Sequence, residues 1–260
     1  MARFRDKKQE LQRICAGADW KEALEELISS EAAALEAVNP LLALLPRPEL
    51  SWQAAFGLGR ALSFIADNNM EAARVFMRRL MWSMNEESGN LGWGIPEAMG
   101  CILAASPALA GEYSRIFISY GRDTGHEDNY VEHAPLRRGV YWGIGRLASA
   151  NPAAALPALP HLTLALEDED AGIRGMAAFA IRQLADNAPK SGETAEESEE
   201  YWKAAGLTLE RAEALAGTTE AAGTAVELFN GRDIVTLSLG SLLARAREGV
   251  EKRRERRGIF

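Results

Sequence analysis

The sequence predicts an all-α protein in which pairs of helices repeat along the chain. Four segments align without gaps: FGLGRAL from Phe56, EAMGCIL from Glu97, WGIGRLA from Trp142 and FAIRQLA from Phe179. Their fourth positions are Gly59, Gly100, Gly145 and Arg182, which gives steps of 41, 45 and 37 residues. A proline follows seven residues after each of the last three, at Pro107, Pro152 and Pro189. This recurrence indicates an internal repeat.

Each repeat contains two helical patterns. In the repeat near 69–106, apolar residues at positions 77, 80, 81 and 84 mark the buried face of a first helix. The aligned segment that follows has small and apolar residues at helical spacing, which lets a second helix approach its neighbours closely. Pro107 and Pro152 suit the first turn of the next helix, and Asn151 suits the N-cap before it.

This pattern divides the chain into about six units. We expect an N-terminal pair to about Val38, and then units near 39–68, 69–106, 107–150 and 151–187. The spacing breaks at an acidic stretch, 188–200, which is predicted to be a mobile loop. A divergent helical cap, 201–260, completes one domain over 1–260, and no strand pattern competes with this assignment.

The repeat resembles the HEAT and armadillo class of α-solenoid. The best match is LEDEDAGIRGMAAFAIRQLA from Leu166, in which Asp170 and Arg174 stand where the family places its aspartate and arginine. LRRGVYWGIGRLA from Leu136 resembles the same helix but lacks the aspartate. The resemblance implies a right-handed α-solenoid of about six HEAT-like helix pairs, with Asp170 and Arg174 joining adjacent repeats. It specifies a fold much more strongly than a function.

Composition narrows the classes of function. A chain of 260 residues with 47% apolar and 25% charged residues is typical of a soluble globular protein with a sizeable core. The opening residues carry alternating charges and no apolar run, so no secretory signal is expected. The longest uncharged stretch, 147–166, contains three prolines and a histidine, which favours two helix segments with a corner over a membrane span.

The cysteines favour a cytoplasmic location, and the net charge disfavours binding to nucleic acid. The two cysteines, Cys15 and Cys101, lie in apolar helical patterns and are expected to be buried thiols in a reducing compartment. The net charge of −8 disfavours nonspecific binding to nucleic acid. Seven basic residues in the C-terminal segment 245–257 indicate either a solvated helix end or a contact with an anionic partner.

Candidate binding residues gather in two segments, which we expect to lie side by side on the concave face of a solenoid. The first segment, 78–97, contains two tryptophans, three glutamates and three glycines between two helical patterns. Its candidates are Arg78, Arg79, Trp82, Asn85, Glu86, Glu87, Asn90, Trp93 and Glu97. The second segment contributes Arg137, Arg138, Tyr141 and Trp142.

Several of these residues also have a structural interpretation. Glu97 follows Pro96 in a first helical turn, where exposed backbone N–H groups stabilise a carboxylate. Trp82 is equally compatible with the core, and the alignment of Trp142 with two phenylalanines favours packing. Arg137 and Arg138 lie at a helix N-terminus, where the macrodipole disfavours cations. They therefore predict a carboxylate partner, such as Glu86 or Glu87, or an anionic ligand.

No catalytic residues or cofactor are assigned from the sequence. His126, Glu127, Asp128, Glu132 and His133 are suitable metal ligands by type, but their spacing matches no known metal motif, and we predict no metal site. HEAT-like deoxyhypusine hydroxylases bind iron through several His-Glu pairs, whereas only 126–127 has that order here. A mid-helix Cys101 gives no support for nucleophilic catalysis.

Three hypotheses about function remain. The first is a non-catalytic interaction or scaffold protein that binds a protein or peptide partner on its concave face. The second is an enzyme or nucleic-acid-binding module similar to the HEAT-like alkylpurine DNA glycosylase, because Trp93 and Glu97, at i and i+4, are spaced to hold a cationic nucleoside. The third is a polar network between repeats with only a structural purpose.

Overall fold

The computed structural model describes residues 2–84, 92–123, 125, 129–187, 195–216 and 219–257. The described chain is mostly helical and contains one small two-stranded antiparallel sheet. It divides into two compact units, Met1–Phe117 and Ile118–Phe260, and each unit is described by itself.

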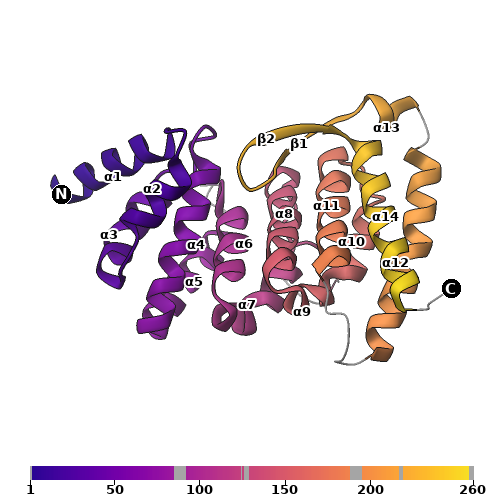
Figure 1. Ribbon diagram of the computed structural model, residues 1–260, viewed down its shortest axis with the longest axis horizontal. Helices are drawn as coiled ribbons and strands as arrows, with labels where there is room; N and C mark the ends of the chain where they lie inside the picture. The colour runs from indigo at the N-terminus through magenta and orange to yellow at the C-terminus, as the bar shows by residue number, and fades with distance from the viewer. Residues whose placement is uncertain are drawn as a thin grey trace. The chain divides into compact units, whose positions relative to one another are not determined.

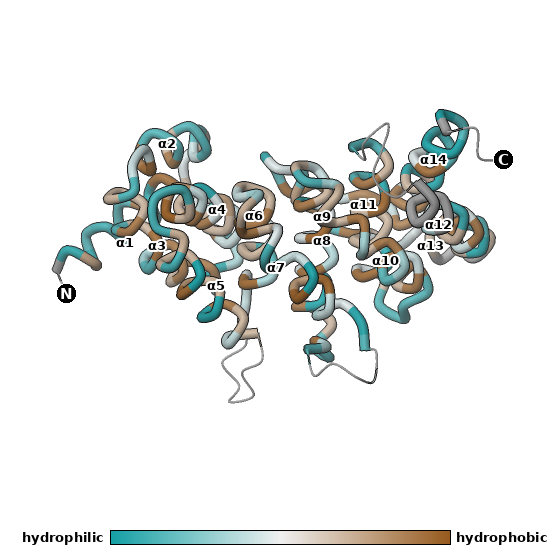
Figure 2. Tube along the Cα trace, turned by 90° about the horizontal axis from the view of Figure 1, so that it is seen from below, coloured by the Kyte–Doolittle hydropathy of each residue, from teal (hydrophilic) through white to brown (hydrophobic). Residues whose placement is uncertain are grey.

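The first unit is helical throughout its described part. Its helices are α1 (Ala2–Cys15), α2 (Trp20–Leu27), α3 (Glu31–Leu42), α4 (Ser51–Asn68), α5 (Met70–Met84), α6 (Ile95–Ala105) and α7 (Pro107–Ser119), whose last two residues belong to the second unit. Within the unit, α4 and α6 lie side by side, and α5 packs behind them (Figures 1 and 2). The helix pair α5–α6 occupies the repeat predicted near 69–106.

Small residues allow α4 and α6 to approach closely, as the aligned segments predict. A Cβ atom at Gly59 would lie 2.8 Å from the carbonyl oxygen of Cys101, so any larger residue collides with the backbone of α6. Near the other end of the pair, Ser63 Oγ donates a hydrogen bond of 3.1 Å to the carbonyl oxygen of Ala105. The two helices are therefore parallel and in a fixed register.

The second unit has the same kind of pairing. Its elements are α8 (Ala134–Ala150), α9 (Pro152–Ala155), the 3₁₀ helix η1 (Leu156–Ala158), α10 (Leu159–Ala165), α11 (Ala171–Asn187), α12 (Ala195–Ala216), α13 (Thr219–Gly223), β1 (Ala225–Phe229), β2 (Ile234–Ser238) and α14 (Leu239–Arg257). Helices α8, α11 and α14 stand in a row, and α11 packs against both of the others (Figure 1).

Helix starts follow the local signals in the sequence. Pro107 and Pro152 are the first residues of α7 and α9, and Asn151 caps α9 by accepting a hydrogen bond of 3.3 Å from the Ala154 N–H. At the start of the first unit, however, α3 begins at Glu31, so the boundary expected near Val38 falls inside a helix. Ser30 caps α3, because its side chain accepts a hydrogen bond from the Ala33 N–H.

The prediction of a helical cap without strands is wrong. Residues 225–238 form an antiparallel hairpin in which Ala225 pairs with Ser238 and Phe229 with Ile234. The connecting residues, Asn230–Asp233, contain an Asn-Gly pair, which is a strong hairpin signal. Gly231 adopts a φ of 100°, a conformation that residues with a Cβ rarely adopt.

The acidic stretch that was predicted to be a loop contains the start of a helix. Residues 188–194 lie outside the described residues, but α12 already begins at Ala195. The loop predicted over 188–200 is therefore wrong for its second half.

Both cysteines are buried, Cys15 in α1 and Cys101 in α6. Burial raises the pKa of the Cys15 thiol to about 12. Within the described ranges, no helix combines the length and the apolar character that a membrane crossing requires.

Candidate functional site

The predicted site residues fall into two groups, one in each compact unit. Arg78, Arg79 and Trp82 lie on α5, and Trp93 and Glu97 lie just before and within α6. The later candidates, Arg137, Arg138, Tyr141 and Trp142, all lie on α8. Asn85, Glu86, Glu87 and Asn90 lie outside the described residues.

Two tryptophans of the first group are exposed. Trp82 is 70% exposed, so the core position that the sequence left open for it is wrong, and Trp93 is 42% exposed. The backbone segments that carry them approach each other closely: a Cβ atom at Gly92 would lie 3.0 Å from the carbonyl oxygen of Ser83. Each tryptophan is therefore next in sequence to a residue of this close contact.

Helix α5 extends this surface by one apolar and two basic side chains. Val75, at 53% exposure, precedes Arg79 by four residues and Trp82 by seven, so the three share one helix face. Arg78 lies beside them and pairs with Glu71 at 2.6 Å, while Arg79 donates a hydrogen bond of 2.8 Å to Asn39 Oδ1 of α3. We refer to Val75, Arg78, Arg79, Trp82 and Trp93 as the tryptophan corner.

Glu97 has a different environment. Gly94, with a φ of 76°, caps α6 and places Glu97 in its first turn, as Pro96 predicts. Its atom Oε2 is buried, and no described residue donates a hydrogen bond to it. Burial raises the pKa of Glu97 to about 7, against the opposing effect of a hydrogen bond from its own backbone N–H. A helix N-terminus alone therefore does not account for this carboxyl group.

Gln53 of α4 shares this property and was missed by the sequence analysis. Its Oε1 is buried and receives no hydrogen bond from the described part of the chain. The signal was available, because Gln53 interrupts an otherwise apolar stretch at the start of α4.

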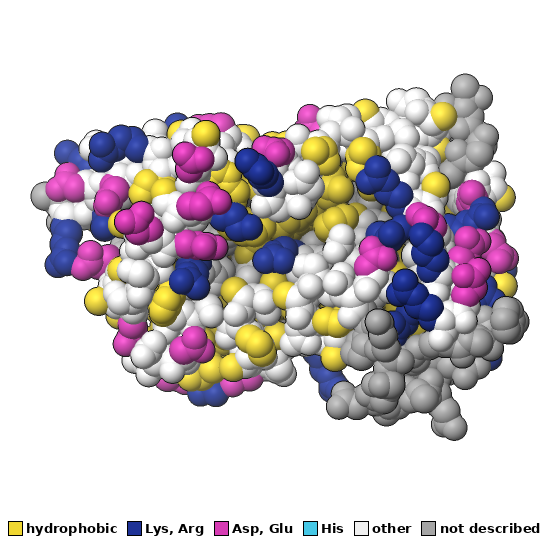
Figure 3. Space-filling model, in the orientation of Figure 1, with side chains coloured by type: hydrophobic (Ala, Val, Ile, Leu, Met, Phe, Trp, Pro, Cys, Tyr) yellow, Lys and Arg dark blue, Asp and Glu magenta, His cyan; other side chains and the backbone are white. Residues whose placement is uncertain are grey.

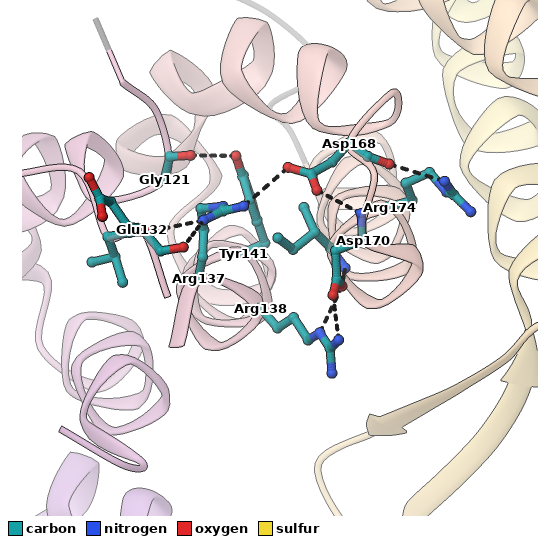
Figure 4. A network of polar contacts seen from close by, with 10 residues as sticks. Gly121, Glu132, Arg137, Arg138, Tyr141, Asp168, Asp170 and Arg174 are labelled. Carbon is teal, nitrogen blue, oxygen red and sulfur yellow. Dashed lines mark hydrogen bonds and ion pairs between the residues drawn. The ribbon is translucent and has the colours of Figure 1, made fainter. Parts of the chain in front are cut away.

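The second group forms a polar network within the second unit (Figure 4). Arg137 is 8% exposed and donates hydrogen bonds of 2.9 and 2.8 Å to the carbonyl oxygens of Val131 and Glu132. It also lies 3.4 Å from a carboxylate oxygen of Asp168, in the turn before α11. Arg137 thus fastens the segment before α8 to the next helix pair.

Arg138 makes the second connection between these helices. Its guanidinium binds Asp170 in bidentate fashion, with a distance of 2.8 Å from Nε to Oδ1. The Arg138 guanidinium lowers the pKa of Asp170, whose Oδ1 also accepts a hydrogen bond from the Ile173 N–H. Arg174, by contrast, donates within its own turn, to the carbonyl oxygen of Asp168.

The carboxylate partners predicted for Arg137 and Arg138 therefore exist, but they are Asp168 and Asp170. Glu86 and Glu87, the partners suggested from the sequence, lie outside the described residues.

Tyr141 and Trp142 are buried and bonded within the same unit. Tyr141 OH donates a hydrogen bond of 2.6 Å to the carbonyl oxygen of Gly121. Trp142 Nε1 donates one of 2.9 Å to the carbonyl oxygen of Phe229, at the end of β1, and the two rings lie 6.3 Å apart. The hairpin therefore covers Trp142, and a partner does not reach either aromatic ring in this arrangement.

The possible metal ligands do not come together in the described part. His126, Glu127 and Asp128 lie outside it, and Glu132 and His133 lie beside the Arg137 network. No group of three or more metal-binding side chains occurs among the described residues.

Two basic side chains of the C-terminal helix form ion pairs with acidic side chains. Arg247 pairs with Glu213 of α12 and with Glu251, and Lys252 pairs with Glu248. Arg182 of α11 also pairs with Glu248, at 3.0 Å. Basic side chains over α11 and α14 accordingly alternate with acidic ones on the face shown in Figure 3.

No family model matches the chain, and no curated protein is significantly similar to it. Among solved structures, it is similar to the crystal structure of an engineered protein from the Northeast Structural Genomics Consortium. That match covers 95% of this chain and 97% of the other, with 15% sequence identity and a TM-score of 0.47. A likeness of this size carries no argument about fold or function.

Proposed function

We propose that this chain is a cytoplasmic HEAT-like α-solenoid protein that acts without catalysis, by binding a protein partner through the tryptophan corner. The observation that carries the proposal is the joint exposure of Trp82 and Trp93 around one close backbone contact. Tryptophan and arginine are the residues that most often dominate the binding energy of protein interfaces. Two exposed tryptophans beside two arginines therefore support a protein-binding surface.

The helix pairing supports the architectural part of this proposal. Parallel packing of α4 with α6, and of α8 with α11 and α14, repeats one arrangement within each unit. The Arg138–Asp170 pair joins successive helices of this kind, which is the role that the HEAT resemblance implies for Asp170.

Photocrosslinking tests the proposed surface. A photoreactive amino acid is placed at 82 or 93 and, as the control, at Leu207 of α12, which is 64% exposed and lies in the other unit. We expect a specific crosslinked protein from positions 82 and 93 and none of the same mass from 207. Identical products from all three positions would show that the corner is not a preferred contact.

A DNA-glycosylase-like activity is the second candidate, favoured by one observation. Glu97 follows the exposed Trp93 by four residues, and its Oε2 atom is buried. This activity requires contacts to DNA phosphates, whereas the described arginines of α5, α8, α11 and α14 cited above pair with acidic side chains or with protein oxygens. Release of alkylated bases from duplex DNA, lost in Glu97→Gln, would establish this second function.

A further inference from the structure

The outer edge of β2 is open among the described elements. β2 packs mainly against β1 and against α13 and α14, the helices on either side of the hairpin in the chain. None of its five residues is buried, whereas three of the five residues of β1 are. β1 also packs against α11, and its last residue accepts the hydrogen bond from Trp142. The hairpin therefore turns β1 toward the helices and leaves β2 outside.

The two ends of the hairpin ladder fix its hydrogen-bonding pattern. In an antiparallel pair of strands, residue pairs that exchange hydrogen bonds alternate with pairs that do not. At the turn, the Asn230 N–H donates to the Asp233 carbonyl oxygen at 3.1 Å. At the open end, the Leu239 N–H donates to the Thr224 carbonyl oxygen at 2.9 Å. Both end pairs are bonded, so every second pair between them is bonded too.

The remaining pairs give β2 a row of outward backbone groups. These pairs contain Ile234, Thr236 and Ser238, whose N–H and C=O groups therefore point away from β1. No backbone hydrogen bond from another described segment reaches these groups. An unpaired row of this kind is a template for another extended strand. The edge accordingly fits a strand.

β2 also lacks the features that usually protect an edge strand from pairing. Its sequence, IVTLS, contains no charged residue and no proline. Ile234 is 55% exposed, and Thr236 is exposed as well. An edge of this composition favours pairing with another strand.

A second copy of the chain offers a strand that matches this edge. Antiparallel pairing of two β2 strands about Thr236 is the register that pairs all five residues, Ile234 with Ser238 and Val235 with Leu237. The outward N–H and C=O groups of the two copies then meet as donors and acceptors. On the opposite face of the strand, Val235 and Leu237 are only half-buried, and each gains an apolar neighbour from the second copy.

The same register brings complementary charges together. Asp233 of one copy lies opposite Leu239 of the other, and Leu239 is the first residue of α14. A helix N-terminus attracts a carboxylate, and α14 has no acidic residue in its own first turn. The symmetry of the pair makes this contact twice, once at each end of the paired strands.

We infer that two copies of the chain associate by antiparallel pairing of their β2 strands about Thr236, which joins the two hairpins into one sheet. The inference goes beyond the proposed function and does not depend on the tryptophan corner. The paired segment is short, so we expect a weak, reversible dimer with a small interface.

Sedimentation equilibrium of the full-length protein between about 1 µM and about 1 mM measures this association. We expect the mean mass to rise with concentration from the 28.3 kDa of one chain toward twice that value. A mass that stays at one chain up to about 1 mM overturns the inference. A photoreactive amino acid at 236 that captures a different protein, and not a second copy, overturns it too and assigns the edge to a foreign strand.

Charge swaps at Thr236 test the register. Glu227 lies opposite Thr236 within the hairpin, so every variant carries Glu227→Gln, which alone is the matched control and should associate as the wild type does. Adding Thr236→Lys or Thr236→Glu sets like charges opposite each other in the dimer. We expect either change to weaken association about fivefold. An equimolar mixture of the two should associate as the control does, because opposite charges then meet.

The indole resonance of Trp142 in ¹⁵N-labelled protein provides a second measurement. It reports on the attachment of the hairpin, because the indole N–H binds the Phe229 carbonyl oxygen, and we expect it to be unchanged in each variant. Unweakened association of the Thr236→Lys and Thr236→Glu variants, or a mixture that associates no better than either variant alone, contradicts the register and overturns the inference.

Discussion

Glu97 is a described residue whose protonation changes between the unfolded and the folded chain near neutral pH. Its pKa is about 7 when folded, against 4.5 for the ordinary group, so the folded chain holds an extra proton between these values. The stability that this proton contributes is fully present below pH 4.5 and is lost as the pH rises through 7. The change amounts to at most about 3.4 kcal/mol.

This sign gives a direct prediction for Glu97→Gln. The variant does not ionise, so its free energy of unfolding is expected to fall less than that of the wild type between pH 5 and pH 8. Urea unfolding at both pH values measures the difference. Glu22→Gln is the control and keeps the wild-type slope. A wild-type slope in Glu97→Gln would mean that the carboxyl group is not buried in solution.

Gly59 gives a second prediction at the scale of single residues. A Cβ atom there meets the backbone of Cys101 at 2.8 Å, and a backbone carbonyl cannot swing aside as a flexible side chain does. Gly59→Ala is therefore expected to destabilise the protein by about 1–3 kcal/mol, the usual cost of overpacking.

Gly111 of α7 provides the matched control. No atom lies within 4 Å of a Cβ built there, and the position is helical and exposed. Gly111→Ala is expected to stabilise the protein by up to about 1 kcal/mol through helix propensity. Thermal unfolding of both variants checks the pair, and an unharmed Gly59→Ala variant would refute the close approach of α4 and α6.

At the scale of secondary-structure elements, the β1–β2 hairpin is joined to α8 by a side-chain hydrogen bond. Trp142 Nε1 donates to the Phe229 carbonyl oxygen, and Val226 of β1 packs against Gly175 of α11. Trp142→Phe keeps an aromatic ring but removes the donor, so this buried carbonyl loses its bond to Trp142. That loss costs about 1–3 kcal/mol.

We therefore expect faster amide hydrogen exchange in β1 and β2 of Trp142→Phe, with α8 and α11 unchanged. Hydrogen exchange followed by mass spectrometry of the hairpin peptides measures this. Uniformly faster exchange over the whole second unit would indicate that Trp142 supports the core and does not act mainly on the hairpin.

Sequence patterns predicted the helices better than the contacts between distant segments. Pro107, Pro152 and Asn151 mark their helix starts because prolines and caps act within a few residues. The hairpin was missed because 201–260 was interpreted as a helical cap, although Asn230-Gly231 between two strand-like runs signals a turn.

The candidate site shows the same limit. Helical periodicity indicates that Glu97 begins a helix, but the burial of its carboxylate beside α4 depends on residues some forty positions away. Likewise, the position of Arg137 and Arg138 at a helix N-terminus predicts a carboxylate partner or an anionic ligand, and the structure shows carboxylates. Their actual partners, Asp168 and Asp170, come from the turn before the next helix pair, which a repeat alignment does not rank above other acidic residues.

At the scale of the whole molecule, the distribution of interactions divides the chain by role. In the second unit, the buried arginine and aromatic candidates make internal bonds, and Arg182 and Arg247 form ion pairs with Glu248 and Glu213. In the first unit, by contrast, Trp82 and Trp93 are exposed. We therefore propose that a partner binds to the first unit.

The most direct test of this assignment compares Trp82→Ala/Trp93→Ala with Leu207→Ala in binding to the crosslinked partner. Truncating two interface tryptophans is expected to weaken the affinity by at least about 30-fold, which corresponds to the 2 kcal/mol or more of a hot spot. The melting temperature should stay unchanged, because both side chains are exposed. Leu207→Ala should bind as the wild type does. Wild-type affinity in the double tryptophan variant would contradict the assignment of partner binding to the tryptophan corner.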